Sequence, residues 1–119
     1  MKIRFKEFIE LNESKKDLDK IKNKYLDNIE IFNVYEFKDK ISIDLIKVKE
    51  KKIGTGSSIM KDLCSYADKS NKIIILTPSD EFGSSKTELI KFYKKFNFVE
   101  NEGENKIFGI FEEMYREPN

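Results

Sequence analysis

The chain of 119 residues contains no histidine and no tryptophan, and its single cysteine is Cys64. The absence of histidine excludes a Ser-His-Asp triad and a His-ligated metal, and one cysteine cannot build a zinc site, so we expect no metal. One cysteine also excludes an internal disulfide and suits a reducing compartment, which favours a cytoplasmic protein. Any proton transfer must use Asp, Glu, Tyr, Lys, Cys, the substrate or water.

The chain also has no large excess of positive or negative charge and no long apolar run. The 23 basic and 22 acidic residues leave a net charge of +1, so no overall field attracts nucleic acid or an anionic membrane. No apolar run approaches the length of a membrane span, and Met1–Arg4 leads into no signal-peptide core. We expect a single domain over residues 1–119, with no membrane partner and no direct nucleic-acid binding.

Apolar periodicity predicts a helix and then a hairpin in the first half of the chain. Residues 1–11 fit both a strand and a helical face, and we favour a short strand that runs into a helical turn. Ser14 with Asp17 predicts a helix start. Two strand-like runs, 29–37 and 41–48, flank a short turn and predict an antiparallel hairpin.

In the second of these runs, 41–48, the alternation of apolar and polar residues changes in the middle. Ile41, Ile43 and Leu45 point to one face of a strand, whereas Ile46 and Val48 take the opposite parity. A β-bulge near Leu45–Ile46 would explain the change, and a strand buried on both faces would explain it equally well.

The second half of the chain predicts a parallel crossover. Residues 57–69 carry a broad apolar helical face that includes Cys64, for which we favour a packing role. The continuous apolar run within 72–77 is typical of a central strand that is covered on both faces. A strand, a helix and a strand in this order predict a right-handed parallel crossover.

A further helix and the last strands follow. Ser85 begins a capping-box pattern, and the apolar helical face behind it extends to Phe96. Asn97 fits a left-handed stop for that helix. Residues 98–100 and 107–116 predict the remaining strands.

The most informative stretch lies between the hairpin and the crossover helix, and it reads Lys51-Lys52-Ile53-Gly54-Thr55-Gly56-Ser57-Ser58. A strand, a glycine loop and a helix start form an anion site from backbone groups. Glycines admit a phosphate close to N–H groups, and the helix N-terminus carries partial positive charge. The run Gly56-Ser57-Ser58 lacks the lysine of a P-loop, and Ile59 occupies the third glycine position of a dinucleotide fingerprint. An ordinary strand-to-helix turn is the alternative interpretation.

Two motifs resemble those of the GNAT N-acetyltransferases. The pattern basic-x-x-Gly-x-Gly, with Lys51 in the basic place, is similar to the family's acetyl-CoA pyrophosphate loop, where arginine or glutamine is usual. The stretch Leu89-Ile90-Lys91-Phe92-Tyr93-Lys94-Lys95-Phe96-Asn97-Phe98 resembles the family's Leu-x-x-Phe-Tyr-x-x-x-Gly-Phe motif, with Asn97 in the glycine place. The resemblance covers roughly residues 24 to 116.

Other segments resemble small members of the family that are carried by phages and mobile elements. These segments are 76–83, 98–101 and 114–116. Residues 41–57 are also similar to members that act against type V CRISPR systems by acetylating a lysine of the nuclease. That likeness is too short to transfer a substrate.

The resemblance implies an α/β fold with the mixed sheet of the GNAT type, acetyl-CoA as the cofactor, and Tyr93 as the acid that protonates the departing CoA thiolate. Backbone groups of Ile46 and Val48 would pair with the pantetheine arm, and the amides of the glycine loop would hold the pyrophosphate. The cofactor-binding residues implied in this way are Ile46, Val48, Lys51, Lys52, Ile53, Gly54, Thr55, Gly56, Ser57 and Ser85.

The chemistry of amine attack on a thioester agrees with these roles. Tyr93, with an ordinary pKa of about 10, is neutral at pH 7 and can donate a proton, while a strand amide could polarise the carbonyl. A core aromatic is the alternative interpretation of Tyr93. Asp44, Asp80 and Glu81 are candidates for the base that deprotonates the amine, although attack by the neutral amine needs no dedicated base.

Together these features predict acetyl transfer from acetyl-CoA to a primary amine, with a protein lysine or peptide amine favoured over a metabolite. The competing hypothesis is a non-catalytic module of GNAT shape that binds CoA or a partner protein, including an anti-CRISPR-type inhibitor. Lys51 and Asn97 depart from the family pattern and support that alternative. The oligomeric state stays open, a homodimer included.

Overall fold

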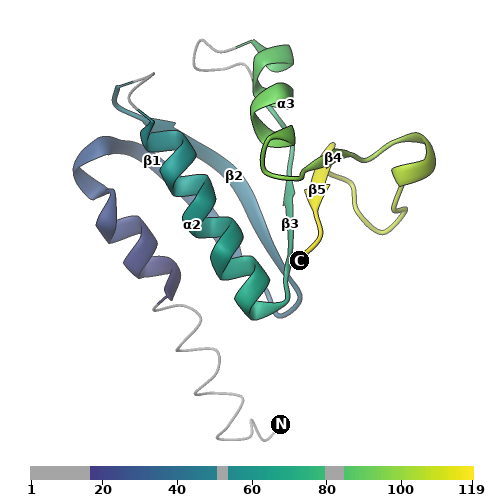
Figure 1. Cartoon of the computed structure of the whole chain (residues 1–119), viewed down its shortest axis with the longest axis horizontal. Helices are drawn as coiled ribbons and strands as arrows, with labels where there is room; N and C mark the ends of the chain where they lie inside the picture. Colours follow the sequence, from purple (N-terminus) through teal and green to yellow (C-terminus); the bar gives the residue numbers. More distant parts are fainter. Residues whose placement is uncertain (1–16, 51–53, 80–84) are drawn as a thin grey trace, which may run out of the picture.

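The computed structural model describes residues 17–50, 54–79 and 85–119. Five strands form one mixed sheet in the order β1-β2-β3-β5-β4. The strands β2 and β3 are parallel, and every other neighbouring pair is antiparallel. The α+β mixed sheet expected from the sequence is therefore confirmed, including the hairpin and the parallel crossover (Figure 1).

The hairpin consists of β1 (Ile29–Glu36) and β2 (Lys40–Val48). A helix over residues 17–24 and the 3₁₀ turn η1 (Leu26–Asn28) precede it. Ser14 and residues 1–11 lie outside the described residues, so the predictions for them are not tested.

A register shift in the hairpin confirms the predicted bulge. Asn33 pairs with Leu45, while the next residue of β1 pairs with Ile43, so Asp44 is the extra residue of β2. The bulge lies beside Leu45, one position before the predicted place. As a result the side chains of Ile41 and Ile43 lie in the core, and Ile46 and Val48 pack against that same core.

The crossover helix α2 (Thr55–Ser70) leads into β3 (Ile73–Leu76). The helix begins two residues earlier than predicted, since Gly54 takes a left-handed conformation with φ 85° and serves as its N-cap. A second left-handed residue, Asn71, ends it. Its buried face includes Cys64, whose pKa is raised by burial, as expected for a packing residue.

The remaining elements are α3 (Lys86–Lys94), β4 (Val99–Glu100), the 3₁₀ turn η2 (Gly103–Asn105) and β5 (Met114–Arg116). Asn97 has φ 70°, which confirms the left-handed stop after α3. The prediction of strand over 107–116 was wrong for residues 107–113, which form an irregular connection. The side chain of Asn101 bonds to backbone groups of that connection and takes the place of a strand partner.

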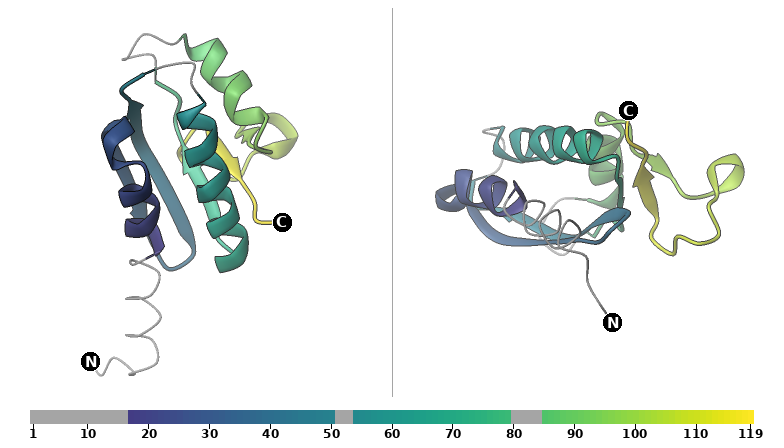
Figure 2. Two further views of the ribbon diagram at one scale, coloured as in Figure 1. Left: turned by 60° about the vertical axis from the view of Figure 1, so that its left-hand side comes forward. Right: turned by 90° about the horizontal axis from the view of Figure 1, so that it is seen from below.

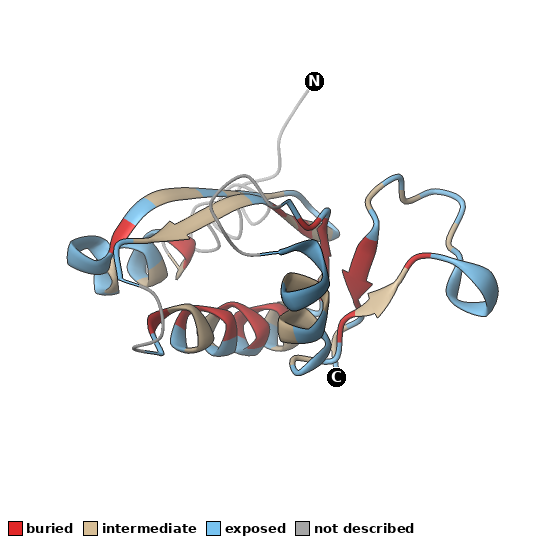
Figure 3. Ribbon diagram, turned by 90° about the horizontal axis from the view of Figure 1, so that it is seen from above, coloured by how far each residue is buried: buried red, intermediate tan, exposed pale blue. Residues whose placement is uncertain are grey.

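Two helices lie on the same face of the hairpin. Figure 2 and Figure 3 show the helix over residues 17–24 and α2 in one layer, with β1 and β2 in the layer against them. The Tyr25 hydroxyl, just after the first helix, donates a hydrogen bond of 2.6 Å to Asp62 of α2. Within the described ranges no helix is long and apolar enough to cross a membrane.

Buried ion pairs close the sheet at the end where β3 begins. Lys72 lies 2.5 Å from Glu36, and both side chains are 10% exposed. Tyr66 of α2 also donates to the Glu36 carboxylate. Beside them the guanidinium of Arg116 donates two hydrogen bonds to Asp68, of 2.7 and 3.0 Å, and this pair ties the end of β5 to α2.

Candidate functional site

The opposite end of the sheet is open, because β2 and β3 separate there. The two strands pair from Lys40 with Ile73 to Ile43 with Leu76, where β3 ends. The strand β2 continues to Val48 with its backbone unpaired on the β3 side, among the residues the structure describes. A cavity of about 560 Å³ lies at this opening, within the size range of small-molecule sites.

The cavity brings together elements from four parts of the chain. The walls come from β2, from the start of α2, from the segment after β3 and from α3. Its lining residues are Ile43, Asp44, Leu45, Ile46, Lys47, Val48, Glu50, Gly54, Thr55, Gly56, Ser57, Ile59, Met60, Leu76, Thr77, Ser79, Glu88, Leu89, Phe92, Tyr93 and Lys95.

The N-terminus of α2 faces this cavity. Gly54, Thr55, Gly56 and Ser57 all line it, and no side chain caps the helix. The first N–H groups of an α-helix have no acceptor inside the helix, and they carry partial positive charge. The start of α2 can therefore hold an anionic group with backbone donors alone.

Gly56 is the point where α2 comes close to α3. A Cβ atom added at this glycine would lie 3.8 Å from Cζ of Phe92, which is ordinary contact. A branched side chain would reach further into the space between the two helices and obstruct the cavity. Gly54 needs glycine for another reason, since its φ of 85° is unfavourable for residues with a Cβ.

Tyr93 projects from α3 into the same cavity. Its ring packs against Phe92 and Phe98, with centroids 5.4 and 5.5 Å apart. Burial raises its pKa above the ordinary value of 10.0, so the hydroxyl is neutral at pH 7. We find no hydrogen-bond partner for this hydroxyl among the described residues, and its proton is available to a ligand.

The structure thus brings together seven of the eleven residues that the resemblance implies as cofactor-binding or catalytic. These seven are Ile46, Val48, Gly54, Thr55, Gly56, Ser57 and Tyr93. Lys51, Lys52 and Ile53 lie outside the described residues, as do two of the candidate bases, Asp80 and Glu81. The third candidate base, Asp44, lines the cavity with an exposed side chain that accepts a hydrogen bond of 3.1 Å from Ser42.

Ser85 has a different position from the others. Its side chain accepts a hydrogen bond of 3.1 Å from the Glu88 backbone N–H and caps α3, as the capping-box pattern predicts. It is not among the residues that line the cavity. The neighbouring Lys86 forms an ion pair of 2.8 Å with Glu113.

Sequence reasoning missed much of the apolar wall. Ile59, Met60, Leu89 and Phe92 line the cavity, although the helical pattern assigns them simply to amphipathic faces. Phe92 stands next to Tyr93 in the helix-to-strand motif, which is the one signal that could have identified it. An apolar wall, a neutral tyrosine and a helix end suit a long ligand with an apolar arm and an anionic group. No group of three His, Cys, Asp or Glu side chains suited to a metal occurs in the described ranges.

Comparison with known proteins gives one informative likeness. No protein-family profile and no curated protein sequence matches this chain. Among solved structures, the crystal structure of the anti-CRISPR protein AcrVA5 is similar, with a TM-score of 0.52 and 23% sequence identity. The likeness covers 69% of this chain and 83% of that protein, and at this identity it shows a shared fold.

Proposed function

We propose that this protein is an N-acetyltransferase that transfers the acetyl group of acetyl-CoA to a primary amine, with a protein lysine or peptide amine as the acceptor. One observation carries the proposal: the opening between β2 and β3 contains both the uncapped start of α2 and the neutral hydroxyl of Tyr93. The fold shared with AcrVA5 and the two GNAT-like motifs support the same reading.

The residues present fit acetyl-CoA. The backbone of β2 beyond Ile43, including Ile46 and Val48, offers unpaired N–H and C=O groups to the amide-containing pantetheine arm. The backbone amides from Gly54 to Ser57 suit the pyrophosphate, because a helix N-terminus attracts anions. Phe92 and Leu89 cover the apolar part of the arm. When bound, acetyl-CoA supplies an activated acetyl thioester.

Each of the chain's own groups then has a defined task. A backbone N–H of β2 at the opening, from Ile46 or Val48, polarises the carbonyl that the amine attacks. The Tyr93 hydroxyl donates its proton to the leaving sulfur, and its raised pKa keeps it protonated throughout the neutral range. Asp44 is positioned at the cavity to accept the proton of the amine, directly or through water.

Replacement of Tyr93 by phenylalanine tests the proposal. The change keeps the ring contacts with Phe92 and Phe98 and removes the proton donor alone. We expect turnover to fall by roughly 10²–10⁴-fold, with acetyl-CoA affinity and melting temperature unchanged. Single-turnover release of free CoA with a lysine-containing acceptor, calorimetric binding of acetyl-CoA and thermal unfolding provide the three readouts.

Tyr35→Phe is the matched control, because Tyr35 is 51% exposed and does not line the cavity. This control should behave as the unchanged protein in all three assays. Normal single-turnover rates in Tyr93→Phe would remove Tyr93 from the mechanism. Binding of acetyl-CoA without acceptor-dependent thiol release would favour the non-catalytic module instead.

A further inference from the structure

The connection between β4 and β5 presents two phenylalanines to solvent. Phe108 is 87% exposed and Phe111 is 93% exposed, far above Leu26 at 53%, which is next among the large apolar residues of the described ranges. The connection projects away from the sheet and its helices (Figures 1 and 3). Two aromatic rings held in water on one projecting segment are typical of a surface that another molecule covers.

Buried polar contacts hold this connection in shape. Asn101 is 7% exposed, and its side-chain amide donates to the carbonyls of Ile110 and Glu112 at 2.9 and 3.1 Å. Its carbonyl oxygen accepts a hydrogen bond of 2.7 Å from the Ile107 N–H. The Tyr115 hydroxyl donates to the carbonyl of Asn105 at 2.5 Å. Because the segment is already ordered, a partner that docks on it loses little conformational freedom of the loop.

The connection also reaches the proposed active site. At its end, the Glu113 N–H donates a hydrogen bond of 3.2 Å to Oγ1 of Thr77, and Thr77 lines the cavity. Glu113 is further paired with Lys86 at the start of α3. The end of the connection is therefore bonded to the wall of the cavity at the open end of the sheet.

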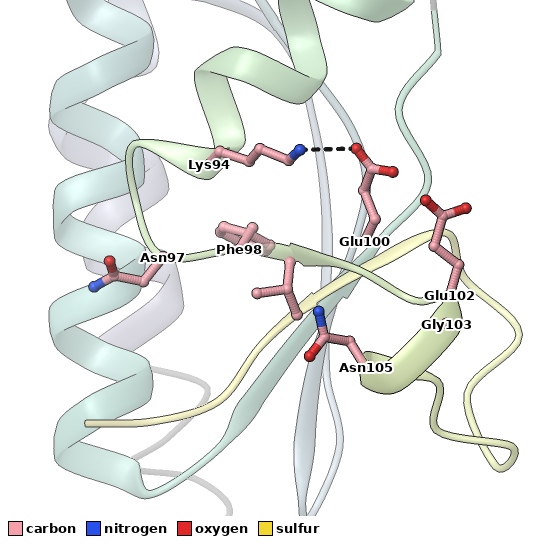
Figure 4. A pocket seen from close by; sticks show the side chains of 8 residues that line it. Lys94, Asn97, Phe98, Glu100, Glu102, Gly103 and Asn105 are labelled. Carbon is pink, nitrogen blue, oxygen red and sulfur yellow. Dashed lines mark ion pairs between the residues drawn. The ribbon is translucent and has the colours of Figure 1, made fainter.

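The segment that carries the two rings is acidic, although two of its glutamates, Glu100 and Glu113, are paired with Lys94 and Lys86. Residues 99–113 include five glutamates and one lysine. Lys94 pairs with Glu100 at 3.0 Å, and Figure 4 shows Glu100 beside Glu102 along an open depression of about 710 Å³ next to β4. A hydrogen bond with Glu100, and then the charge of that carboxylate, raise the pKa of Glu102. A second copy docked loop against loop would bring like charges together, whereas a basic partner would neutralise them.

We propose that Phe108 and Phe111 form a docking site for the acceptor protein, whose complementary segment carries apolar side chains between lysines. The rings supply apolar contact area, and the glutamates of the same connection favour a basic segment. The identity of the partner as the acetyl acceptor rests on the proposed function, but the docking itself does not.

Direct peptide binding tests the docking without any acyl-CoA. The probes are short fluorescent peptides in which leucines alternate with lysines at several spacings, and matched sets in which serine replaces leucine or glutamate replaces lysine. We expect at least one leucine–lysine peptide to bind the full chain roughly tenfold more tightly than both of its matched forms. The double variant Phe108→Ser/Phe111→Ser should lose this preference, and its melting temperature should not change because both rings are exposed.

Phe37→Ser is the matched control, since Phe37 is also exposed, at 49%, but lies at the hairpin turn. It should retain the preference. Equal affinity for the leucine and serine peptides, or retained preference in the double variant, would overturn the proposal. So would a dimer in sedimentation that the double variant converts to monomer, because a second copy would then be the occupant.

The two proposals fail in different assays. Failure of the acetyltransferase proposal appears as absent acceptor-dependent thiol release with a small amine such as lysine amide. Failure of the docking proposal leaves that release intact and appears only with the peptides. If both hold, the double variant acetylates lysine amide normally and the leucine–lysine peptide roughly tenfold more slowly at low peptide concentration.

Discussion

The two ends of the parallel pair β2–β3 differ in how their polar groups are satisfied. At the closed end, Lys72 pairs with Glu36 inside the protein, and the buried Arg116 pairs with the partly exposed Asp68. At the open end, β2 runs on past its last pairing with β3, and the start of α2 has no side-chain cap. The closed end therefore stabilises the fold, while the open end leaves donors and acceptors for a ligand. Mutations at the two ends should separate stability from binding.

Lys72→Met should produce the largest effect, and that effect should be on stability. The substitution leaves the Glu36 carboxylate buried without its cation, and we expect the free energy of unfolding to fall by about 3–5 kcal/mol. Acetyl-CoA affinity of the folded protein should not change, since neither residue lines the cavity. Denaturant unfolding and calorimetry measure the two quantities.

The double variant Glu36→Gln/Lys72→Met is its control, because removal of both charges should recover part of the lost stability. If Lys72→Met left stability unchanged, the closed end would not be the stabilising end of the sheet.

Gly56→Val should do the reverse at the open end. Its branched side chain would intrude between α2 and Phe92, and we expect acetyl-CoA affinity to fall roughly tenfold or more. Stability should change little, because Gly56 is not among the residues with positive φ. Calorimetric titration of acetyl-CoA measures the affinity.

Gly56→Ala gives a graded comparison, since its Cβ makes only ordinary contact at 3.8 Å and should cost less affinity. Equal affinity in Gly56→Val and the unchanged protein would remove the start of α2 from the binding site.

The smallest expected effect is on the pH dependence of the closed end. The hydrogen bonds from Arg116 lower the pKa of Asp68 below its ordinary value of 3.8. A carboxyl with a lowered folded-state pKa stabilises the fold above its unfolded-state pKa, and this stabilisation is lost as the pH falls through the folded-state value. Asp68→Asn should therefore lower stability by about 1 kcal/mol at pH 7 and have less effect near pH 2.

Urea unfolding of both proteins across this pH range gives the comparison. Parallel stability curves in the two proteins would mean that the Asp68–Arg116 pair adds no acid sensitivity. Acetyl-CoA affinity at pH 7 should be the same in both, as for Lys72→Met.

Local patterns were enough to predict the part of the fold that builds the open end. The parity change between Leu45 and Ile46 indicated a bulge or a strand buried on both faces, the continuous run in β3 indicated a central strand, and Asn97 indicated a helix stop. Each of these signals is carried by neighbouring residues. The glycine loop and Tyr93 could likewise be placed at one cavity, although their roles in chemistry stay predictions.

Long-range contacts explain what the sequence did not reveal. The apolar residues after Lys106 favoured a strand, but Asn101 captures the backbone groups that a strand would pair, and Phe108 and Phe111 stay exposed. The pairing of Lys72 with Glu36 joins residues far apart in the chain, and the sequence offers many other lysines and glutamates. The place of β5 between β3 and β4 also depends on tertiary packing.

Outside the bulge at Asp44, the length of β2 is more constrained than its composition. Many apolar side chains could replace Ile46 or Val48 and still meet the core, because both need only to face it. Loss of Asp44 would remove the bulge and leave Ile46 and Val48 facing the core, whereas loss of a residue on either side of the bulge would turn part of the strand to the opposite face. During divergence, substitutions in this strand should therefore be common, and single-residue insertions or deletions should be rare except at the bulge.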